Sequence, residues 1–587
     1  FGYQDHPVLA LTDNNNKEKI VNTTGNFGVD INLIKGLVWT SRLAGTINNR
    51  RYESFNGPKT YDGIDYDGHS ITANSFLNYN VDIQKLNIAA TLGYEYNENY
   101  SKSYVMDIGG FPDIPGLEGP ANGSEYLWAD WNISGNTRWT ERSESYFFRA
   151  NLSYNRKYLL GFSIRRDGTS KLAKENRYSN FPAVSAGWVI SDEAFMSRQH
   201  VINLLKLRTS YGMTGSITNV SMADCYDRLS SDIYWGKPAL SVASTLGNPD
   251  LQWEKTNQVD VGVDLALFQN RLTLIAEWYL KRTSGMMNSE PLPSSTGGYT
   301  SRKINAGTIR NSGVDLALNF QHHFTKDWGL TAGINMNINR SKVIDLPVDN
   351  WAYSSAYYGG GNTPRPRLKI GQSFGALEMY RALGLDERGD IIYDDVSGNG
   401  SIDAADKVII DNLTPKFTGG LNLGVSWKNL SLFGQFSFTY GGKIYNLDEQ
   451  LLRSTELGYD DVMKNKPDYI LDRWTQENQS SRYPRFVVGA HGAQNETGWN
   501  DRPSTLYLFD ASFLKLNKLT LSYNLPQNWI QKLGMTSCSV YLSGENLFTL
   551  KNKKLNVPDP EAALTSGIAQ KGVPSPRSFM IGLDLTF

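Results

Sequence analysis

The stretch QVDVGVDLALFQNRLTLIAEWYL, residues 258–280, carries the pattern that decides the fold. Valine and leucine stand at every second position up to Leu267, alternating mostly with polar residues or glycine. Gln269-Asn270 forms a short polar break, and the alternation resumes at Leu272. A period of two places successive side chains on opposite faces of a β-strand. The stretch therefore predicts a β-hairpin with one apolar face and one mostly polar face.

The same period recurs along the chain, whereas helical periodicity is nearly absent. Further examples are residues 27–33, 86–94, 148–154, 158–164, 314–320, 421–427, 514–521 (with a slip of phase at Asn517) and 579–587. No run of about 18 apolar residues exists, which excludes a transmembrane helix. Aromatic residues make up 12% of the chain, which also contains 54 glycines. This composition predicts an all-β protein that is either soluble or membrane-spanning.

Strand length and loop asymmetry favour a membrane barrel. Many alternating segments run about 9–11 residues, the span of a tilted membrane strand. Tight turns at 34–36, 155–156 and 269–270 alternate with long polar connections at 97–136, 212–254 and 446–504. Short turns on one rim and long loops on the other are typical of outer-membrane barrels, whose apolar face meets lipid and whose polar face lines the lumen. Aromatic residues near strand ends are typical of an interfacial girdle: Trp39, Tyr94, Tyr96, Tyr154, Trp278, Tyr279 and Trp427.

Several function classes are excluded by charge and by the scatter of reactive residues. The formal net charge is −1, which leaves no general electrostatic attraction for nucleic acid or for an anionic membrane surface. Cys225 and Cys538 are too few and too far apart to predict a disulfide framework or a metal site. His322 and His323 are adjacent on a predicted strand, so their rings point to opposite faces. No nucleophile and base stand in a supporting context, and an enzyme is not expected.

The C-terminal segment from Arg577 to Phe587 is an amphipathic strand that ends in phenylalanine. Such an ending resembles the assembly signal of bacterial outer-membrane proteins, because an unpaired apolar edge can pair with the barrel-assembly machinery. The predicted signal residues are Phe579, Ile581, Leu583, Leu585 and Phe587. The alternative is a soluble protein that merely ends on a buried strand.

Residues 395–406, DVSGNGSIDAAD, match an EF-hand-like loop within a predicted extracellular loop. Oxygen-bearing residues fall at the spacing of Ca²⁺ ligands, and the glycine at loop position 6 permits a sharp turn. The candidate ligands are Asp395, Ser397, Asn399, Ser401 (through its carbonyl), Asp403 and Asp406. Position 12 is Asp rather than Glu, which weakens the case for bidentate closure. The pattern predicts a structural Ca²⁺, or Mg²⁺, and the alternative is an ion-free polar turn.

Five further segments resemble the SusC/RagA family of TonB-dependent outer-membrane transporters. They are RRDGTS at 165–170 followed by RYSNFPAVSAGW at 177–188, NPDLQWEKT at 248–256, NAGTIRNSGVDL at 305–316, TPKFTGG at 414–420 and SGENLFT at 543–549. Their order and spacing fit along essentially all 587 residues. Together they are specific, although each alone is weak.

The resemblance implies an all-β fold, a large antiparallel transmembrane β-barrel of about 22 strands closed by an N-terminal plug. About 18 of these strands are expected in residues 1–587. Neither a plug nor a TonB box is found in this sequence, so we interpret it as a barrel portion that is incomplete at its N-terminus. A barrel with open edges is not tolerated in lipid. We therefore expect these residues to be part of a longer protein. The resemblance also implies its location, the outer membrane of a Bacteroidetes-type bacterium.

The implied function is active import of a bulky nutrient, an oligosaccharide or an oligopeptide. The implied partners are a SusD-like surface lipoprotein, the TonB complex acting through the missing N-terminal region, and a second transporter–lipoprotein pair in a dimer. Loop aromatics would contact substrate or lipoprotein: Tyr126, Trp128, Trp131, Trp351, Tyr353, Tyr357 and Tyr358. Two alternatives stay open, namely a passive channel or structural barrel, and a secreted glycan-binding β-protein.

Overall fold

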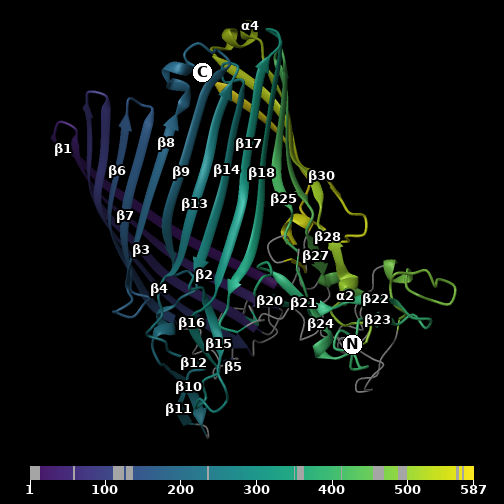
Figure 1. Ribbon diagram of the computed structural model, residues 1–587. Coiled ribbons are helices and arrows are strands. Elements are labelled where there is room, and N and C mark those ends of the chain that lie inside the picture. Colours follow the sequence, from purple (N-terminus) through teal and green to yellow (C-terminus); the bar gives the residue numbers. More distant parts are fainter. Residues whose placement is uncertain are drawn as a thin grey trace.

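The computed structural model describes residues 14–56, 60–109, 125–126, 137–234, 237–348, 351–352, 363–411, 413–453, 468–486, 499–563, 567–570 and 574–587. One sheet of 18 strands dominates these residues (Figure 1). Its long members are β1 (Asn14–Ile34), β2 (Leu37–Asn56), β3 (Thr60–Ile83), β4 (Leu86–Gly109), β6 (Thr137–Tyr154), β7 (Tyr158–Thr169), β8 (Tyr178–Val189), β9 (Ile202–Ser216), β13 (Glu254–Leu267), β14 (Leu272–Ser284), β17 (Thr308–His323), β18 (Trp328–Asp345), β25 (Phe417–Trp427), β26 (Leu430–Tyr440), β29 (Phe513–Asn524), β30 (Ser537–Lys551) and β32 (Ser578–Thr586). The two-residue strand β5 (Glu125–Tyr126) pairs with the end of β4.

The remaining elements lie in the connections. Short strands are β10 (Leu229–Tyr234), β11 (Lys237–Val242), β12 (Thr245–Leu246), β15 (Met287–Pro291), β16 (Ser301–Asn305), β19 (Trp351–Ala352), β20 (Arg365–Leu368), β21 (Ala376–Tyr380), β22 (Ala382–Leu385), β23 (Ile391–Tyr393), β24 (Lys407–Ile410), β27 (Lys443–Asn446), β28 (Leu508–Asp510) and β31 (Ile568–Ala569). Helices are α2 (Leu447–Arg453) and α4 (Gln527–Ile530), with 3₁₀ turns η4 (Ile190–Asp192), η5 (Ala194–Met196), η6 (Met222–Cys225), η7 (Ala404–Asp406), η8 (Asp468–Leu471), η9 (Thr505–Tyr507), η10 (Gln531–Leu533) and η11 (Pro560–Ala563). Among the described residues, no helix is long and apolar enough to cross a membrane.

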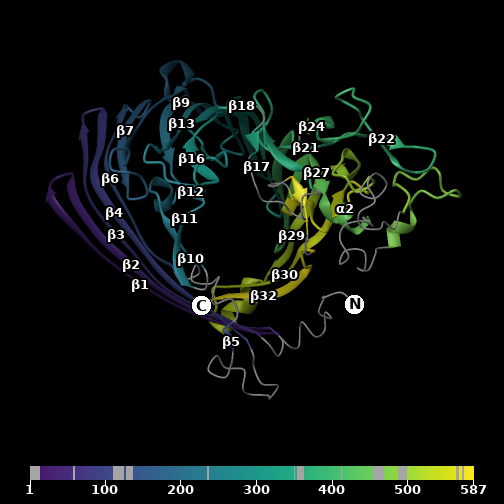
Figure 2. The same ribbon diagram turned by 90° about the horizontal axis from the view of Figure 1, so that it is seen from below.

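Each long strand pairs antiparallel with the next long strand along the chain, from β1 to β32. The sheet curves into an incomplete ring when seen from below (Figure 2). Within the part of the chain that the structure describes, no pairing joins β1 to β32, so these two strands form the edges. The predicted all-β barrel fold is confirmed, and the 18-stranded sheet agrees with the expected number.

The predicted hairpin at 258–280 is β13 and β14, joined by a turn in which Gln269 and Asn270 adopt positive φ. The turn after β1 uses Gly36 in the same left-handed region, and Asn155 and Arg156 do so between β6 and β7. These turns lie at one rim, at the top of Figure 1, while the long connections gather at the other. The phase slip at Asn517 is a β-bulge, because both partner strands of β29 shift register there.

Two expectations are corrected. The strands are longer than predicted, since β3 and β4 have 24 residues each. The region 97–136 is not all loop, because β4 continues to Gly109, and 212–254 includes the end of β9 and the hairpin of β10 and β11. The physical reason is that backbone pairing continues beyond the regular apolar row of each strand, where polar residues such as Glu98 and Lys102 interrupt the alternation and weaken its signal.

Register keeps the two faces of the sheet distinct from strand to strand. Leu316 on β17 is opposite Ala276 on β14 and Met336 on β18. Its chain neighbour Asp315 is opposite Glu277 and Asn337 on the same two strands. Because pairing residues share a face, the apolar set is continuous on one side and the polar set on the other. The outward face is therefore apolar and the lumenal face polar, as expected for a membrane barrel.

The buried apolar core lies outside the membrane-spanning sheet. Connections after β18, β26 and β30 pack together into what we call the loop belt, residues 363–411, 441–453, 499–512, 552–563 and 567–570. Its fully or nearly fully buried side chains include Leu377, Met379, Tyr445, Leu447 and Tyr507. A second cluster joins the connections after β7, β9 and β14 around Leu172, Cys225 and Leu251. A wet lumen and a lipid-facing exterior leave the extracellular connections as the place where apolar side chains can be buried.

Candidate functional site

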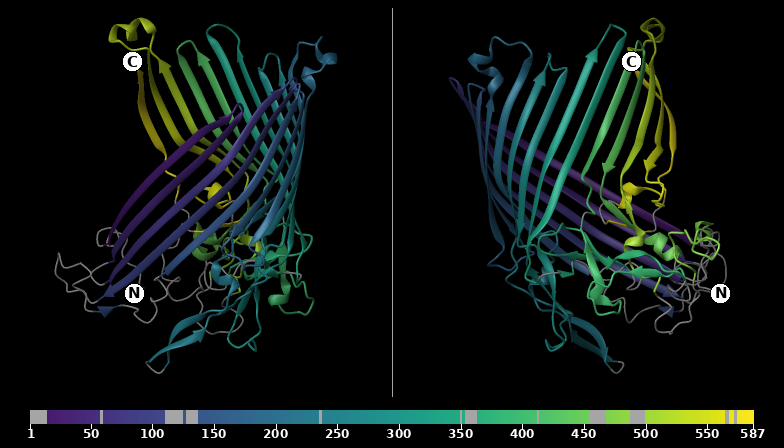
Figure 3. Two further views of the ribbon diagram at one scale, coloured as in Figure 1. Left: turned by 90° about the vertical axis from the view of Figure 1, so that its left-hand side faces the viewer. Right: turned by 45° about the vertical axis from the view of Figure 1, so that its right-hand side comes forward.

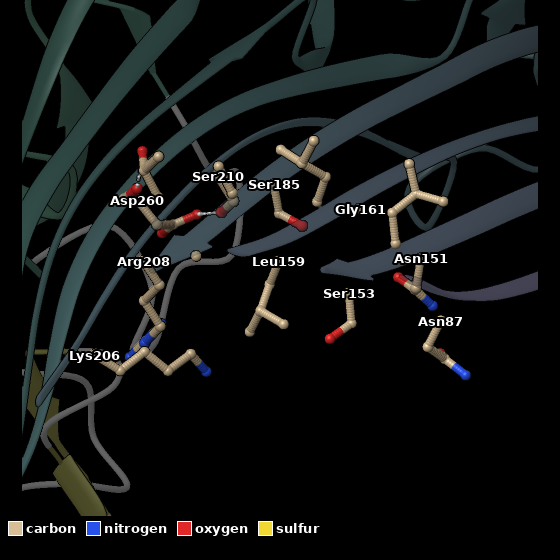
Figure 4. Close-up of a pocket in the computed structure, with 15 residues that line it drawn as sticks. Asn87, Asn151, Ser153, Leu159, Gly161, Ser185, Lys206, Arg208, Ser210 and Asp260 are labelled. Carbon is tan, nitrogen blue, oxygen red and sulfur yellow. Dashed lines mark hydrogen bonds between the residues drawn. The ribbon is translucent and has the colours of Figure 1, made fainter. Parts of the chain in front are cut away.

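A hollow of ≈ 390 Å³ lies against the lumenal face of β4, β6, β7, β8, β9 and β13 (Figure 4). Small and polar residues of adjacent strands form its floor, with Ser185 on β8 and Ser210 on β9. Ser210 Oγ donates to Asp260 Oδ2 on β13 at 3.0 Å. Asn151 and Gly161 continue the floor toward β6 and β7. The wall at this level thus combines serine, asparagine and charged groups with the apolar side chain of Leu159, and its polar part is suited to a hydrated solute.

Glycine at position 161 gives the side chains of the neighbouring strands room at the floor of the hollow. A Cβ atom at Gly161 would lie 2.5 Å from Ser185 Oγ and 3.3 Å from Asn151 Oδ1. Neither distance leaves room for a side chain unless the neighbours move. The polar groups of β6 and β8 therefore approach each other across β7 only because position 161 carries no side chain.

Beside the hollow, charged side chains form a cross-strand network. Arg208 on β9 contacts Asp264 Oδ1 through Nε at 3.2 Å and Glu277 Oε2 on β14 through Nη1 at 2.6 Å. Lys206 Nζ lies 3.6 Å from Asp264 Oδ2. A Cβ atom at Gly262 would stand 2.8 Å from the guanidinium carbon, so glycine lets Arg208 lie across β13 and reach β14.

A second network stands on the lumenal face of β4, β6 and β7. Arg165 contacts Asp167 Oδ1 through Nε at 2.6 Å, and its Nη2 contacts Glu95 Oε1 at 3.1 Å and Ser145 Oγ at 2.8 Å. These ion pairs cross three strands and hold opposite charges close together. The lumen therefore presents paired charges and hydroxyl groups. Such groups bind polar solutes or protein segments weakly, and they offer no activated nucleophile.

The predicted metal loop folds as one unit. Asp395 accepts from the backbone N–H of Gly398 at 2.8 Å and of Gly400 at 2.9 Å, and both glycines have positive φ. Asp406 accepts from the N–H of Ser397 at 2.9 Å and of Asp403 at 2.7 Å. These two backbone hydrogen bonds hold the pKa of Asp406 below its usual value. The loop is thus brought together by its own amides, with both oxygens of Asp406 engaged.

The remaining candidate ligands, Asn399, Ser401 and Asp403, belong to the same loop. Asn399 Oδ1 accepts from the Ser401 N–H at 2.8 Å, and Asp403 caps η7 by accepting from the Ala405 N–H at 2.7 Å. The described residues contain no group of three His, Cys, Asp or Glu side chains placed to hold a metal ion. The hard oxygen donors suit Ca²⁺ chemically, and the ion stays a prediction.

Comparison with known proteins identifies the family. The profile described as "TonB dependent receptor-like, beta-barrel" matches residues 2–547. The chain belongs to this family. It is 26% identical to TonB-dependent receptor P3 of Formosa agariphila over 99% of this chain and 60% of that protein. It is 29% identical to TonB-dependent receptor SusC of Bacteroides thetaiotaomicron over 76% of this chain and 43% of that protein.

A similar solved structure is that of the RagAB peptide transporter, with a TM-score of 0.83 and 26% identity over 98% of this chain and 63% of that one. The chain spans about 60% of the length of two relatives that it matches along nearly its whole length, TonB-dependent receptors P3 and P39 of Formosa agariphila. Proteins of this TonB-dependent receptor family are outer-membrane barrels that act as receptors and transporters rather than enzymes. The predicted fold, location and non-enzymatic class are thereby confirmed.

In this receptor barrel the predicted assembly strand is β32, at the edge of the sheet. Its alternating residues lie on the outward face, with exposed fractions of 74% for Phe579, 80% for Ile581 and 58% for Leu583. Leu585 continues the row and Phe587 follows the strand, also exposed. The predicted apolar edge is therefore present, and its role in assembly stays a prediction.

Only two of the seven aromatic residues predicted to contact substrate or lipoprotein lie within the described residues. Trp128, Trp131, Tyr353, Tyr357 and Tyr358 lie outside the described residues. Of the other two, Tyr126 ends β5 opposite Ile108, and Trp351 begins β19 opposite Leu368.

Sequence reasoning overlooked the lumenal residues of the receptor barrel. Arg208, Asp264 and Glu277 were not singled out, although each stands at a polar position of an alternating strand. The available signal was charge on the polar side of neighbouring hairpins, as in Lys206 and Arg208 beside Leu205 and Leu207. Which charges meet depends on register, which the alternation alone does not provide.

Proposed function

We propose that the full-length protein imports a bulky nutrient, an oligosaccharide or an oligopeptide, across the outer membrane. The observation that carries the proposal is the likeness to the RagAB peptide transporter over 98% of this chain. The polar wall around Ser185, Ser210 and Arg208 supports passage of a hydrated solute along the lumen. Energy would come from a TonB complex acting on a plug in the full-length protein.

A SusD-like surface lipoprotein is the proposed partner at the extracellular mouth. The loop belt supports this proposal, because its buried core gives the extracellular rim a rigid surface on which a lid could rest. Two transporter–lipoprotein pairs could associate as a dimer. Co-purification of the barrel with the product of an adjacent SusD-like gene would support the pair. Full uptake in a strain lacking that product would contradict it.

The direct test is uptake of defined oligomers by cells with and without this protein. Labelled oligopeptides and oligosaccharides of graded length are offered to the wild type, to a deletion strain and to a strain lacking TonB. Loss of uptake of one oligomer class in both mutants, with free monomers still used, is the expected result. Uptake that persists without TonB would instead favour the alternative of a passive channel, as would steady conductance of the purified protein in planar bilayers.

The secreted glycan-binding alternative is not proposed, because the family is one of outer-membrane barrels.

We also propose that residues 395–406 hold a structural Ca²⁺. The support is the set of hard oxygen donors at the required spacing together with the turns at Gly398 and Gly400. Asp395→Ala with Asp403→Ala should remove Ca²⁺-dependent protection of this loop against proteolysis. Protection that is identical with Ca²⁺ and with chelator in the unaltered protein would contradict the proposal.

The C-terminal strand is proposed as the assembly signal recognised by the barrel-assembly machinery. Deletion of Phe587 should lower the amount of heat-modifiable barrel in the outer membrane, and Thr586→Ala serves as the control on the same strand. Normal folded amounts after the deletion would remove this proposal.

A further inference from the structure

Four exposed cations stand together on the outward face of three neighbouring strands. Arg282 lies on β14, Arg310 on β17, and Arg340 and Lys342 on β18. Arg282 is directly opposite Arg310, and Arg310 is directly opposite Lys342. Arg340 lies on the same face two residues nearer the short-turn rim than Lys342, opposite Ser312. The three strands lie side by side in Figure 1. We call these four residues the cation row.

The cation row begins where the apolar face ends. On β14 the outward residues from Arg282 toward the short-turn rim are Leu280, Trp278, Ala276, Leu274 and Leu272. Ten residue steps separate Leu272 from Arg282, which at about 3.3 Å per residue and a tilt of about 45° give about 23 Å of height. The apolar band of such barrels is about 25 Å tall. The cations therefore stand at the level of the outer-leaflet headgroups.

The arrangement is electrostatically unfavourable by itself. Like charges directly opposite each other on paired strands destabilise a sheet, and here two such pairs are consecutive. Among the described residues, no ion pair joins any of the four cations to a carboxylate. Asp345 follows on β18 beyond a register shift and forms no ion pair with them in this part of the structure. An external anion would offset the repulsion.

Another part of the same wall shows the contrast. Arg142 on β6 is also an exposed outward residue, just beyond the aromatic end of the apolar face at Tyr146. Its Nε donates to Glu98 Oε2 on β4 at 2.7 Å. There the sheet supplies its own counter-charge at headgroup level, whereas at the cation row it does not.

We propose that the cation row binds the phosphate group of an anionic lipid in the outer leaflet. Guanidinium groups bind phosphate through paired N–H donors, and three of the four residues are arginine. Basic residues beside an anionic membrane surface are attracted to its headgroups. A lipid fits better than a soluble phosphate because Leu280 and Trp278, next to Arg282 on the membrane side, offer an apolar surface for acyl chains.

The test uses the full-length protein, purified in a neutral detergent and titrated by native mass spectrometry. The probes are monophosphoryl lipid A, the same lipid after dephosphorylation, and inorganic phosphate. Retained adducts with the phosphorylated lipid are expected, with affinity at least about tenfold lower for dephosphorylated lipid. Inorganic phosphate should not compete at concentrations that saturate the lipid. Equal binding of both lipids, or full competition by inorganic phosphate, would overturn the proposal.

Variants locate the site. The triple variant Arg282→Gln, Arg310→Gln, Lys342→Gln should lower affinity for the phosphorylated lipid at least about tenfold, and Arg310→Gln alone by a smaller factor. Arg142→Gln is the matched control and should bind as the unaltered protein does. Should the triple variant fail to assemble, the single variant decides. Unchanged affinity in Arg310→Gln, or an equal loss in Arg142→Gln, would show that the phosphate is not bound at the cation row.

Discussion

The two sides of the extracellular rim are built by different means. Strands β1 to β4 have 21, 20, 24 and 24 residues and continue beyond the apolar band as a paired sheet (Figure 3). Strands β25, β26 and β29 have only 11, 11 and 12 residues, and packed loops take over where they end. The long strands are held by backbone pairing and exposed cross-strand contacts. The loop belt is held by buried side chains, so single substitutions should matter far more there.

The largest effect is expected at Glu449 in the loop belt. Its carboxylate accepts from Arg453 Nε at 3.1 Å and from the hydroxyl of Tyr483, and both charged side chains are buried. Glu449→Ala leaves Arg453 without this partner and should cost about 4 kcal/mol of belt stability. Faster hydrogen exchange in 441–453 measures the loss.

The matched control for Glu449 lies on the long strands. Arg51 Nε and Glu53 Oε1 are 2.9 Å apart, and the Arg51 side chain is 57% exposed. Arg51→Ala should cost less than about 1 kcal/mol. Equal exchange rates in the two variants would contradict the contrast between the two sides of the rim.

A cavity in the belt core should have the next largest effect. Met379 is fully buried among Leu377, Tyr445 and Tyr507. Met379→Ala should destabilise the belt by about 3 kcal/mol, through lost burial and an unfilled cavity. Ile20→Ala on β1, where the side chain is 52% exposed, should change stability by less than about 0.5 kcal/mol. Chemical unfolding of both variants in lipid nanodiscs measures the two losses of stability. Equal losses in Met379→Ala and Ile20→Ala would mean that the belt is loosely packed.

A smaller effect is expected where the belt attaches to the barrel wall. Lys515 on β29 is nearly buried and contacts Asp559 Oδ2 at 2.8 Å and Glu561 Oε2 at 3.1 Å. Burial favours the neutral acid, yet hydrogen bonds from Lys515 and Ser575 hold the pKa of Asp559 below its usual value. Lys515→Met should release residues 552–563 from the barrel wall. The expected loss of stability is about 2 kcal/mol, less than at the fully buried pair of Glu449 and Arg453, because Glu561 is partly exposed.

Lys518 on the same strand provides the control for this attachment. It lies 3.5 Å from Glu545 with both side chains well exposed, so Lys518→Met should leave residues 552–563 protected. Limited proteolysis of this segment compares the two. Cleavage that is no faster in Lys515→Met than in Lys518→Met would mean that the attachment does not depend on Lys515.

The smallest effect concerns the opposite rim, where a single carboxylate holds the turn between η4 and η5. Hydrogen bonds from Tyr158, Trp188 and Lys157 lower the pKa of Glu193 to about 2. A lowered carboxyl pKa stabilises the folded turn fully above about pH 4.5, and this contribution is lost as pH falls toward about 2. Pepsin should cleave residues 190–201 more slowly in the unaltered protein than in the Glu193→Gln variant at pH 5. As the pH falls from about 4.5 to about 2, the two cleavage rates should become equal. A constant ratio from pH 5 to 2, with Asp192→Asn as control, would contradict the assignment.

The membrane-spanning part of the fold could be predicted because lipid imposes a period of two. The alternation defined the hairpin of β13 and β14, the turn at Gln269 and Asn270, the bulge at Asn517 and the apolar row of β32. The extended ends of β1 to β4 could not be predicted, because polar residues such as Glu98 and Lys102 interrupt the apolar alternation there while backbone pairing continues. The loop belt was missed for a related reason, since Leu377, Met379 and Tyr507 come from separate connections without a shared period.

The sequence predicted the polar character of the candidate site but not its specific contacts. A polar lumenal face followed from the alternation, but the contact of Arg208 with Glu277 across Gly262 requires register and the absence of a side chain on the intervening strand. The loop at 395–406 was predicted as a metal site from the spacing of its oxygen-bearing residues, and the ion stays a prediction. That its carboxylates are bound by the loop's own amides required coordinates.

The central claim is that one face of this sheet meets lipid and the other meets water, and neighbouring residues of one strand test it most directly. Single cysteines at Leu316 and at Asp315, in a background with Cys225→Ala and Cys538→Ala, carry a nitroxide label in reconstituted membranes. The label at 316 should be relaxed more by oxygen and the label at 315 more by a water-soluble nickel complex. Equal accessibility to the nickel complex at both positions, or the reverse order, would contradict the account.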